Sequence, residues 1–438
     1  MNQKHETGLY KSVFSEICKI KIVDCHEHLP SESQFPTGEN IHIGRFFQHY
    51  ARCDLVSAGM PVADMDKVRE DSSLSPHKRW DLLKPWYLKA WNTAYCEALR
   101  IAMRDIYGVE DFADGTVDAL TEAMRRNVKP GFTRRVFDKA GIDFAMDNAA
   151  AMVDVPHVDY SSFDPDCFLC DMLDCFTAFD IKGLASAAGL EILRLDDFLR
   201  CMDVIFERHA KISGAFKIGR AYDRPLLFED LPKNAVEKTF NRLLAFNDRP
   251  DRRDIQALED FIVHEICRRC GEYGLRLKFH TGLQEGSENF ISNSRAALLA
   301  NLFMKYPRTK FDIYHISYPY QEEALTLAKN FPNVTVNFCW MWIINPAAGR
   351  RALSDMLDAV PLNKIHGFGG DFLFVEGSYA HAAIARREIA RVLCEKVEEG
   401  RFSEERAVAA GRAILRENAI ANFDLERRRA AFRKFCTR

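Results

Sequence analysis

The segment KIVDCHEH at residues 21–28 is the most informative stretch for the fold, because an apolar, strand-like run ends there in two histidines. His26 and His28 stand two residues apart, so on an extended chain both imidazoles project from the same face. A pair with this spacing can chelate one cation. Alone it is weak evidence, since two histidines near the end of a strand are as often solvated or hydrogen-bonded to other groups.

Four further strand-like runs end in the same way, with Lys217, His280, His315 and Asp371. The runs are AFK at 215–217, LRLKFH at 275–280, KFDIYH at 310–315 and IHGFGGD at 365–371. Imidazole and carboxylate ligands suit divalent transition metals. Strand ends that are distant in sequence converge at the carboxyl-terminal face of a (β/α)8 TIM barrel. A chain of 438 residues can hold such a barrel, at about 250 residues, with a large insertion and a helical tail.

Strand-like and helical stretches alternate from about residue 140, as expected for β-α units around a parallel sheet. After the strand at 21–28 we predict strands at 142–146, 175–179, 214–219, 275–280, 311–315, 334–338 and 365–370. The more than one hundred residues between the first two strands are too many for a simple crossover. We therefore expect a helical cap at 35–135, a barrel formed by 1–34 and 136–438, and a helical tail from Ser403.

The composition is that of a soluble enzyme. The chain has 60 Lys and Arg against 63 Asp and Glu, a net charge of −3 that indicates neither nucleic acid nor an anionic membrane as a partner. No apolar run approaches the ~20 residues of a membrane span, and the first residues are too polar for a secretory signal. We expect a cytoplasmic protein. Its thirteen cysteines fit reduced thiols, and neither Cys167/Cys170 nor Cys267/Cys270 has the context of a zinc module.

The order of these strand-end residues resembles the amidohydrolase superfamily of metal-dependent barrel enzymes. Several phrases are closer to its amidohydrolase-2 branch, which holds hydrolases, decarboxylases and relatives of uronate isomerase: DCHEHLP, KFHTGL, YHISYPY, INPAA and ILRENAIANF. The resemblance covers about residues 22–423 and leaves the cap without a counterpart. It implies the (β/α)8 fold and a divalent metal, most of all zinc, with manganese, iron or nickel as alternatives and with one or two ions bound.

The resemblance also implies roles for single residues. His26 and His28 would bind the principal metal, with Asp371 as a further ligand or as the acid/base for the proton of a metal-activated water; His280 would be another ligand. His315 would orient or deprotonate water if one ion is bound, and would join His280 on a second ion if two are bound. In binuclear members, the lysine at the position of Lys217 is carboxylated and bridges the two ions. The sequence around Lys217 here favours a protonated amine that faces a substrate carboxylate.

An alternative, purely structural role for Asp371 is to cap the helix that follows the eighth strand. Arg220 and Tyr222 could present donors to an anionic substrate, although a salt bridge at the barrel rim explains the arginine equally well. Trp340 could line the substrate pocket, although core packing explains it more simply. Arg45 is a further candidate to reach the mouth of the barrel from the cap.

Three functions follow from this pattern. The first is a metal-dependent hydrolase of a small, carboxylate-bearing amide, ester or lactone, in which a bound ion lowers the pKa of water from about 15.7 towards ~7. The second is a decarboxylase or a uronate isomerase-type enzyme that uses the ion as a Lewis acid. His315 favours water activation, because the uronate isomerase pattern generally lacks that histidine, whereas DCHEHLP favours the isomerase. The third, a barrel without catalysis, is disfavoured because no ligand position is missing. Homo-oligomers are common among such barrels, and we expect one here.

Overall fold

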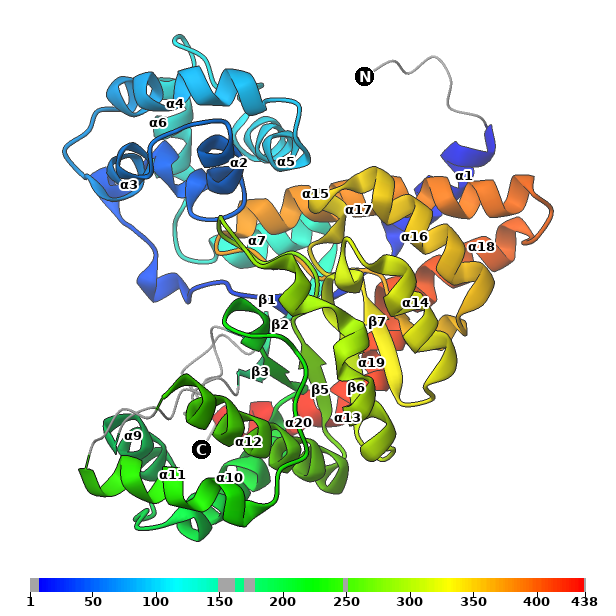
Figure 1. The fold of residues 1–438 in the computed structure, drawn as a ribbon. Helices are drawn as coiled ribbons and strands as arrows, with labels where there is room; N and C mark the ends of the chain where they lie inside the picture. Colours follow the sequence, from blue (N-terminus) through cyan, green and yellow to red (C-terminus); the bar gives the residue numbers. More distant parts are fainter. Residues whose placement is uncertain (1–7, 149–161, 169–177, 247–250, 437–438) are drawn as a thin grey trace.

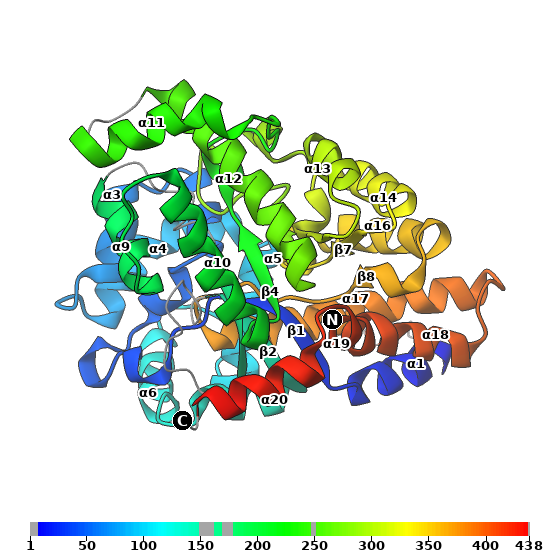
Figure 2. The same ribbon diagram turned by 90° about the horizontal axis from the view of Figure 1, so that it is seen from below.

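Eight parallel strands run in sequential order through the centre of the molecule (Figures 1 and 2). The computed structural model describes residues 8–148, 162–168, 178–246 and 251–436. The strands are β1 (Ile22–Glu27), β2 (Ile142–Asp147), β3 (Phe163–Phe168), β4 (Ala215–Ile218), β5 (Arg276–Phe279), β6 (Lys310–Ile313), β7 (Val334–Asn337) and β8 (Ile365–His366). Each pairs with its successor in parallel register.

Backbone hydrogen bonds join β1 to the segment that follows β8. The amide of Cys25 donates to the carbonyl of Phe368 at 3.2 Å, the amide of Asp371 to that of His26 at 2.9 Å, and the amide of His28 to that of Phe372 at 3.2 Å. These bonds bring the first and last strands together, as barrel closure requires. The predicted (β/α)8 barrel is therefore the fold of the chain.

The third strand lies twelve residues earlier than the sequence suggested, so that prediction was wrong. We expected it at 175–179, but β3 occupies Phe163–Phe168 and pairs with β2 and β4. Residues 175–177 lie outside the described ranges, and helix α9 (Ala178–Ala188) begins directly after them. The sequence of β3, FDPDCF, contains a proline and two aspartates, which strands usually avoid, so pairing within the barrel outweighs local propensity.

Helices surround the strands, as the view from below shows (Figure 2). The barrel helices are α10 (Leu195–Ile212), α11 (Lys233–Phe246), α12 (Arg252–Tyr273), α13 (Ala300–Lys305), α14 (Gln321–Asn330), α15 (Met341–Ile344), α16 (Pro346–Ala359) and α17 (Val375–Glu398). Helix α12 shows both end signals: Asp251 accepts hydrogen bonds from the amides of Arg253 and Asp254, and Gly274 ends the helix with φ +65°. Cys267 and Cys270 are buried free thiols within α12, and Cys170 lies outside the described residues.

The long connection between β1 and β2 forms a group of helices beside the barrel (Figure 1). They are α2 (Ala51–Ser57), α3 (Val62–Glu70), α4 (Pro76–Ala90), α5 (Ala94–Ala102) and α6 (Val117–Asn127). Helix α7 (Phe132–Ala140) contains the predicted boundary at residue 135, and it packs on the barrel against β2 and α17. The division of the chain at residues 34 and 136 stays a prediction.

Helices also form the two ends of the described chain. Helix α1 (Gly8–Lys19) packs against α17 and α18 (Glu404–Arg412), and α19 (Asn418–Asn422) and α20 (Leu425–Cys436) complete the tail. Within the described ranges, no helix combines the length and apolar character needed to span a membrane.

The interior of the barrel holds a buried polar network where layers of branched apolar side chains are usual. Asp312 accepts hydrogen bonds from Thr335 at 2.6 Å and Asn337 at 2.9 Å, and lies 3.0 Å from Nδ1 of His366. Arg276 donates to the hydroxyl of Thr335 at 2.8 Å. Burial alone would raise the pKa of Asp312, but His366 and Arg276 outweigh it and hold the pKa below its usual range. The barrel core is therefore ionic as well as apolar.

Candidate metal centre

The residues singled out at the strand ends converge at one end of the barrel. His26 lies within β1 and is fully buried, and His28 follows the strand with a side chain 30% exposed. Asp371, from the segment that closes the barrel, lies against both rings. The Nε2 atoms of His26 and His28 are 3.1 Å apart, and Oδ1 of Asp371 is 3.4 Å and 3.3 Å from them.

These three distances suit one cation. Ligand atoms about 2.0–2.1 Å from a tetrahedral zinc ion stand about 3.3–3.4 Å from one another. Burial and Lys217 both keep the pKa of His26 well below its usual value, so its ring is neutral and can act as a ligand. Burial would raise the pKa of Asp371, but the three histidines His26, His28 and His315 outweigh it and hold the carboxyl ionised. Two imidazoles and a carboxylate are a donor set for a divalent metal.

A second donor group follows the ends of β5 and β6. The Nε2 atom of His280 donates to the carbonyl of Leu283 at 3.0 Å, and Nδ1 of His315 donates to that of Cys339 at 2.9 Å. Since a carbonyl only accepts, these bonds leave Nδ1 of His280 and Nε2 of His315 as bare lone pairs, and the two atoms face each other at 3.1 Å. Oδ2 of Asp371 lies 3.7 Å from Nε2 of His315.

Two lone pairs in contact need a proton or a cation between them. Burial lowers the pKa of His280 well below its usual value and that of His315 to about 4, which disfavours the proton at neutral pH. Asp371 connects the two donor groups, because one of its oxygens faces His26 and His28 and the other faces His315. The residues fit one ion at the first pair and can hold a second at the other.

Asp371 takes an unusual backbone conformation, with φ +62°. The amide of Asp371 donates to the carbonyl of His26, and the hydroxyl of Tyr50 donates to the carbonyl of Asp371. The alternative that Asp371 caps the following helix does not hold, because α17 begins at Val375 with Phe374 at its N-cap. A helix end therefore does not explain this strained conformation.

Lys217 reaches the same place from β4. Its Nζ atom lies 2.8 Å from Nε2 of His26 and 4.6 Å from the ring centre of Tyr314, and the residue is 3% exposed. The amine is thus close enough to touch whatever His26 binds. Whether it is carboxylated or faces a substrate carboxylate stays a prediction.

The three substrate candidates lie in different surroundings. Arg220 enters a buried ion-pair network with Glu259 at 2.6 Å, and a further pair joins it to Asp223 at 3.4 Å. The ring of Tyr222 lies 4.8 Å from that of His280, and the ring of Trp340 meets that of His315 edge to face at 5.3 Å. The ion pairs give Arg220 a structural role. The positions of Tyr222 and Trp340 are compatible with substrate contact, and all three assignments stay predictions.

Arg45 does not reach the mouth of the barrel as a free cation. It forms a buried pair with Glu376 of α17, with nitrogen-to-oxygen distances of 3.2 Å and 3.3 Å. Its guanidinium fixes the inserted helices to the barrel.

Several residues at the centre were missed from the sequence. Cys339 is the second residue after β7 and forms a candidate donor group with His315 and Asp371, so the same strand-end rule could have found it. His49 and Tyr50 come from the insertion, and no sequence pattern tied them to the barrel mouth. The ring of Tyr50 stacks on Trp340 at 4.5 Å, and burial lowers the pKa of His49 to about 4.

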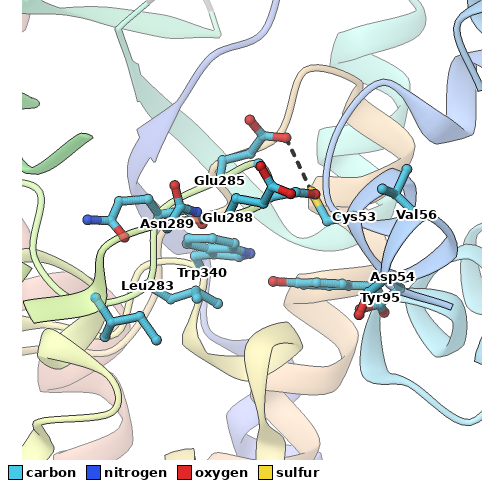
Figure 3. Close-up of a pocket in the computed structure, with 14 residues that line it drawn as sticks. Cys53, Asp54, Val56, Tyr95, Leu283, Glu285, Glu288, Asn289 and Trp340 are labelled. Carbon is cyan, nitrogen blue, oxygen red and sulfur yellow. Dashed lines mark hydrogen bonds between the residues drawn. The ribbon is translucent and has the colours of Figure 1, made fainter. Parts of the chain in front are cut away.

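A cavity of about 460 Å³ adjoins the centre between α2, α5 and the loop after β5 (Figure 3). Trp340 and Leu283 are among the residues that line it, and the carbonyl of Leu283 accepts from His280. Three carboxyl groups line it, those of Asp54, Glu285 and Glu288.

Comparisons with known proteins agree with this architecture. Residues 237–425 match the model of the amidohydrolase family. A stretch of 150 residues is 29% identical to protein fluG of Emericella nidulans; it covers 34% of this chain and only 17% of that protein.

Solved structures share the fold over nearly the whole chain. Uronate isomerase from Thermotoga maritima has a TM-score of 0.79 at 14% identity and covers 95% of this chain and 98% of its own. Glucuronate isomerase from Caulobacter crescentus gives 0.78 at 15% identity, with 97% and 96% covered. A protein described as a metal-dependent hydrolase from Lactobacillus casei gives 0.66 at 15% identity, with 95% and 98% covered. The region that matches the amidohydrolase family model carries His280, His315 and Asp371. The chain is thus similar to this family over its C-terminal half, and His315 and Asp371 lie in groups that could hold a metal ion.

Proposed function

We propose that the protein hydrolyses a small, carboxylate-bearing amide, ester or lactone. The observation that carries this proposal is the pair of facing lone pairs on His280 and His315 beside the ionised Asp371. This arrangement supports activation of a water molecule, because His280, His315 and Asp371 are all close enough to accept its proton. A divalent ion at this centre would lower the pKa of water and polarise the carbonyl of the substrate.

The residues of the chain then have distinct tasks. His26, His28 and Asp371 would hold the ion, and Asp371 would also accept the proton of the attacking water and return it to the leaving group. His315 orients the water, with its tautomer fixed by the carbonyl of Cys339. Lys217 offers an ammonium group to the carboxylate of the substrate.

The rest of the substrate would extend into the cavity between the insertion and the loop after β5. We infer that residues 35–135 act as a cap that supplies one wall, with Tyr222 and Trp340 against the substrate. The carboxyl groups of Asp54, Glu285 and Glu288 support a hydrogen-bonding, uncharged or cationic substrate part at that end.

Isomerisation of a uronate is the second candidate. The observation that favours it is the likeness of the whole fold, inserted helices included, to two isomerase structures. Such a reaction would use Asp371 and the ion to move a proton within the substrate, without consuming water. Decarboxylation at the same centre is a variant of this alternative.

The mass balance of the reaction separates these candidates. Metal-loaded enzyme would be incubated with D-glucuronate, with D-galacturonate, and with a panel of N-acyl amino acids and carboxylate-bearing lactones, and products would be weighed by mass spectrometry. A net gain of one water supports the hydrolase. A product of unchanged mass from a uronate supports the isomerase and rejects the hydrolase, and loss of carbon dioxide supports the decarboxylase.

Metal content tests the centre itself. We propose zinc as the ion, with manganese, iron or nickel as alternatives, and we would measure metal per chain in the parent and in Lys217→Ala. Two ions falling to one or none indicate a carboxylated, bridging Lys217. One ion that survives the change makes Lys217 a substrate-binding amine. Light scattering on the same samples tests the homo-oligomer that we propose, and fractionation of the source cells tests a cytoplasmic location.

A further inference from the structure

Two carboxyl groups on β1, Asp24 and Glu27, are fully buried beside the metal centre and take no part in the proposed reaction. Oδ1 of Asp24 accepts the amides of His26 and Gly370, each at 3.0 Å. Oε2 of Glu27 accepts the amide of Phe372 at 2.8 Å. One oxygen of each carboxyl is therefore fixed as an acceptor of backbone hydrogen bonds.

The other two oxygens approach the same face of Gly370. A Cβ atom on that glycine would lie 1.8 Å from Oε1 of Glu27 and 3.1 Å from Oδ2 of Asp24. The Ser378 hydroxyl also approaches Glu27, but otherwise the two oxygens have only each other as partners within the described chain. Two bare carboxylate oxygens buried in contact would repel, so one proton must lie between them.

Either carboxyl can carry the shared proton, because the two facing oxygens are equivalent as donor and acceptor. The hydrogen bond between them joins the two side chains into one unit.

This unit holds both neighbours of Asp371. Asp24 binds the amide of Gly370, Glu27 binds the amide of Phe372, and Asp371 between them has the left-handed φ of +62° that a residue other than glycine adopts only when its surroundings impose it. We propose that Asp24 and Glu27 form an acid clamp, a hydrogen-bonded pair that positions Asp371 for the metal centre. This inference rests on the proposed role of Asp371 as a metal ligand.

The geometry predicts an unusual pattern among amide substitutions. In Asp24→Asn the new amide nitrogen donates to the carboxylate of Glu27, and in Glu27→Gln it donates to that of Asp24, so either single change preserves the clamp. In the double variant two amide nitrogens face each other, both donors, and the pair is broken. We expect metal affinity within about threefold of the parent in each single variant and a loss of about 10–100-fold in the double variant.

The test is a competitive chelator titration of Zn²⁺ on the full-length protein, alongside urea unfolding of the metal-free form. The matched control is Asp312→Asn, which changes a buried carboxyl in the barrel interior away from Asp371 and should affect unfolding more than metal affinity. A purely structural role would lower the stability of the metal-free protein and leave Zn²⁺ affinity unchanged.

Three outcomes overturn the clamp. The double variant could bind Zn²⁺ as tightly as the parent, or the single variants could bind it as weakly as the double variant. In the third outcome, the double variant loses no more Zn²⁺ affinity than the Asp312→Asn control. If the double variant does not fold, Glu27→Met against Glu27→Gln makes the same comparison, because only glutamine keeps both hydrogen bonds. Asp371→Asn is measured separately. Unchanged affinity in that variant rejects Asp371 as a ligand, whatever the clamp variants do.

Discussion

We propose the most specific chemical task at the centre for His315, because its bare Nε2 atom lies near both His280 and Asp371. We expect His315→Asn to lower kcat for hydrolysis by about 10²–10⁴-fold, the usual contribution of a positioned acid/base group. Metal bound at His26 and His28 should remain.

Steady-state kinetics and metal analysis on the same preparation check this prediction. His264→Asn is a suitable control, since that histidine is buried against Tyr306 and Phe228, away from the centre. A His315 variant with parental kcat would remove the residue from the mechanism.

Asp54 in the cavity wall should make stability depend on pH. Burial raises its pKa from 3.8 to about 6, so the folded state holds this proton more tightly than the unfolded state. The contribution of Asp54 to stability is therefore full below pH 4 and falls as pH rises to about 6. Because the group is partly exposed, we expect Asp54→Asn to gain roughly 1–3 kcal/mol over the parent at pH 7 and little or nothing at pH 4.

Urea unfolding of both proteins at several pH values measures this difference, in which all other titrating groups cancel. A difference that stays constant from pH 4 to pH 7 would show that Asp54 does not carry the effect.

The inserted helices are attached to the barrel by a buried ionic contact. Arg45 meets Glu376 of α17, and Tyr107 donates to the same carboxylate at 2.7 Å. Removing one partner of a buried pair leaves an uncompensated charge, so Arg45→Met should cost about 3–5 kcal/mol. Lys84→Met, which breaks an exposed pair with Asp114 inside the insertion, should cost about 1 kcal/mol or less.

Chemical denaturation gives both values, and limited proteolysis shows where the chain opens. Cleavage of Arg45→Met should begin between β1 and β2. Equal costs for the two variants would mean that the Arg45 contact does not attach the insertion.

The metal should stabilise the molecule as a whole, because its candidate ligands come from β1, β5, β6 and the segment after β8. An ion that binds only the folded state, at 1,000 times its dissociation constant, adds about 4 kcal/mol. Removal by a chelator should therefore lower the melting temperature, and Zn²⁺ should restore it. Calorimetry with and without added Zn²⁺ checks this, and an unchanged melting temperature would contradict a centre built from these strands.

The sequence was sufficient for the barrel and for the residues on its strands. His26, His28, His280, His315 and Asp371 were predictable because a parallel barrel brings strand ends together whatever their separation in sequence. The strand at 163–168 was not predictable, because its proline and two aspartates are atypical of strands and its pairing with β2 and β4 depends on the tertiary fold. His49 and Tyr50 were missed for a related reason, since no local sequence pattern indicates where an insertion packs against the barrel. The pairing of Asp24 with Glu27 depends on the closeness of Gly370, which only the folded chain reveals.

The closure of the barrel through Asp371 also bears on how the protein is made. Glu27 and its partner Phe372 are 345 residues apart. At 5–20 residues per second, a ribosome needs roughly 17–70 seconds to synthesise the intervening chain. Throughout that time the nascent chain presents His26 and His28 without the aspartate that completes their donor set. We therefore expect stable metal acquisition at this centre to be a late step of biosynthesis that follows emergence of the last barrel strand.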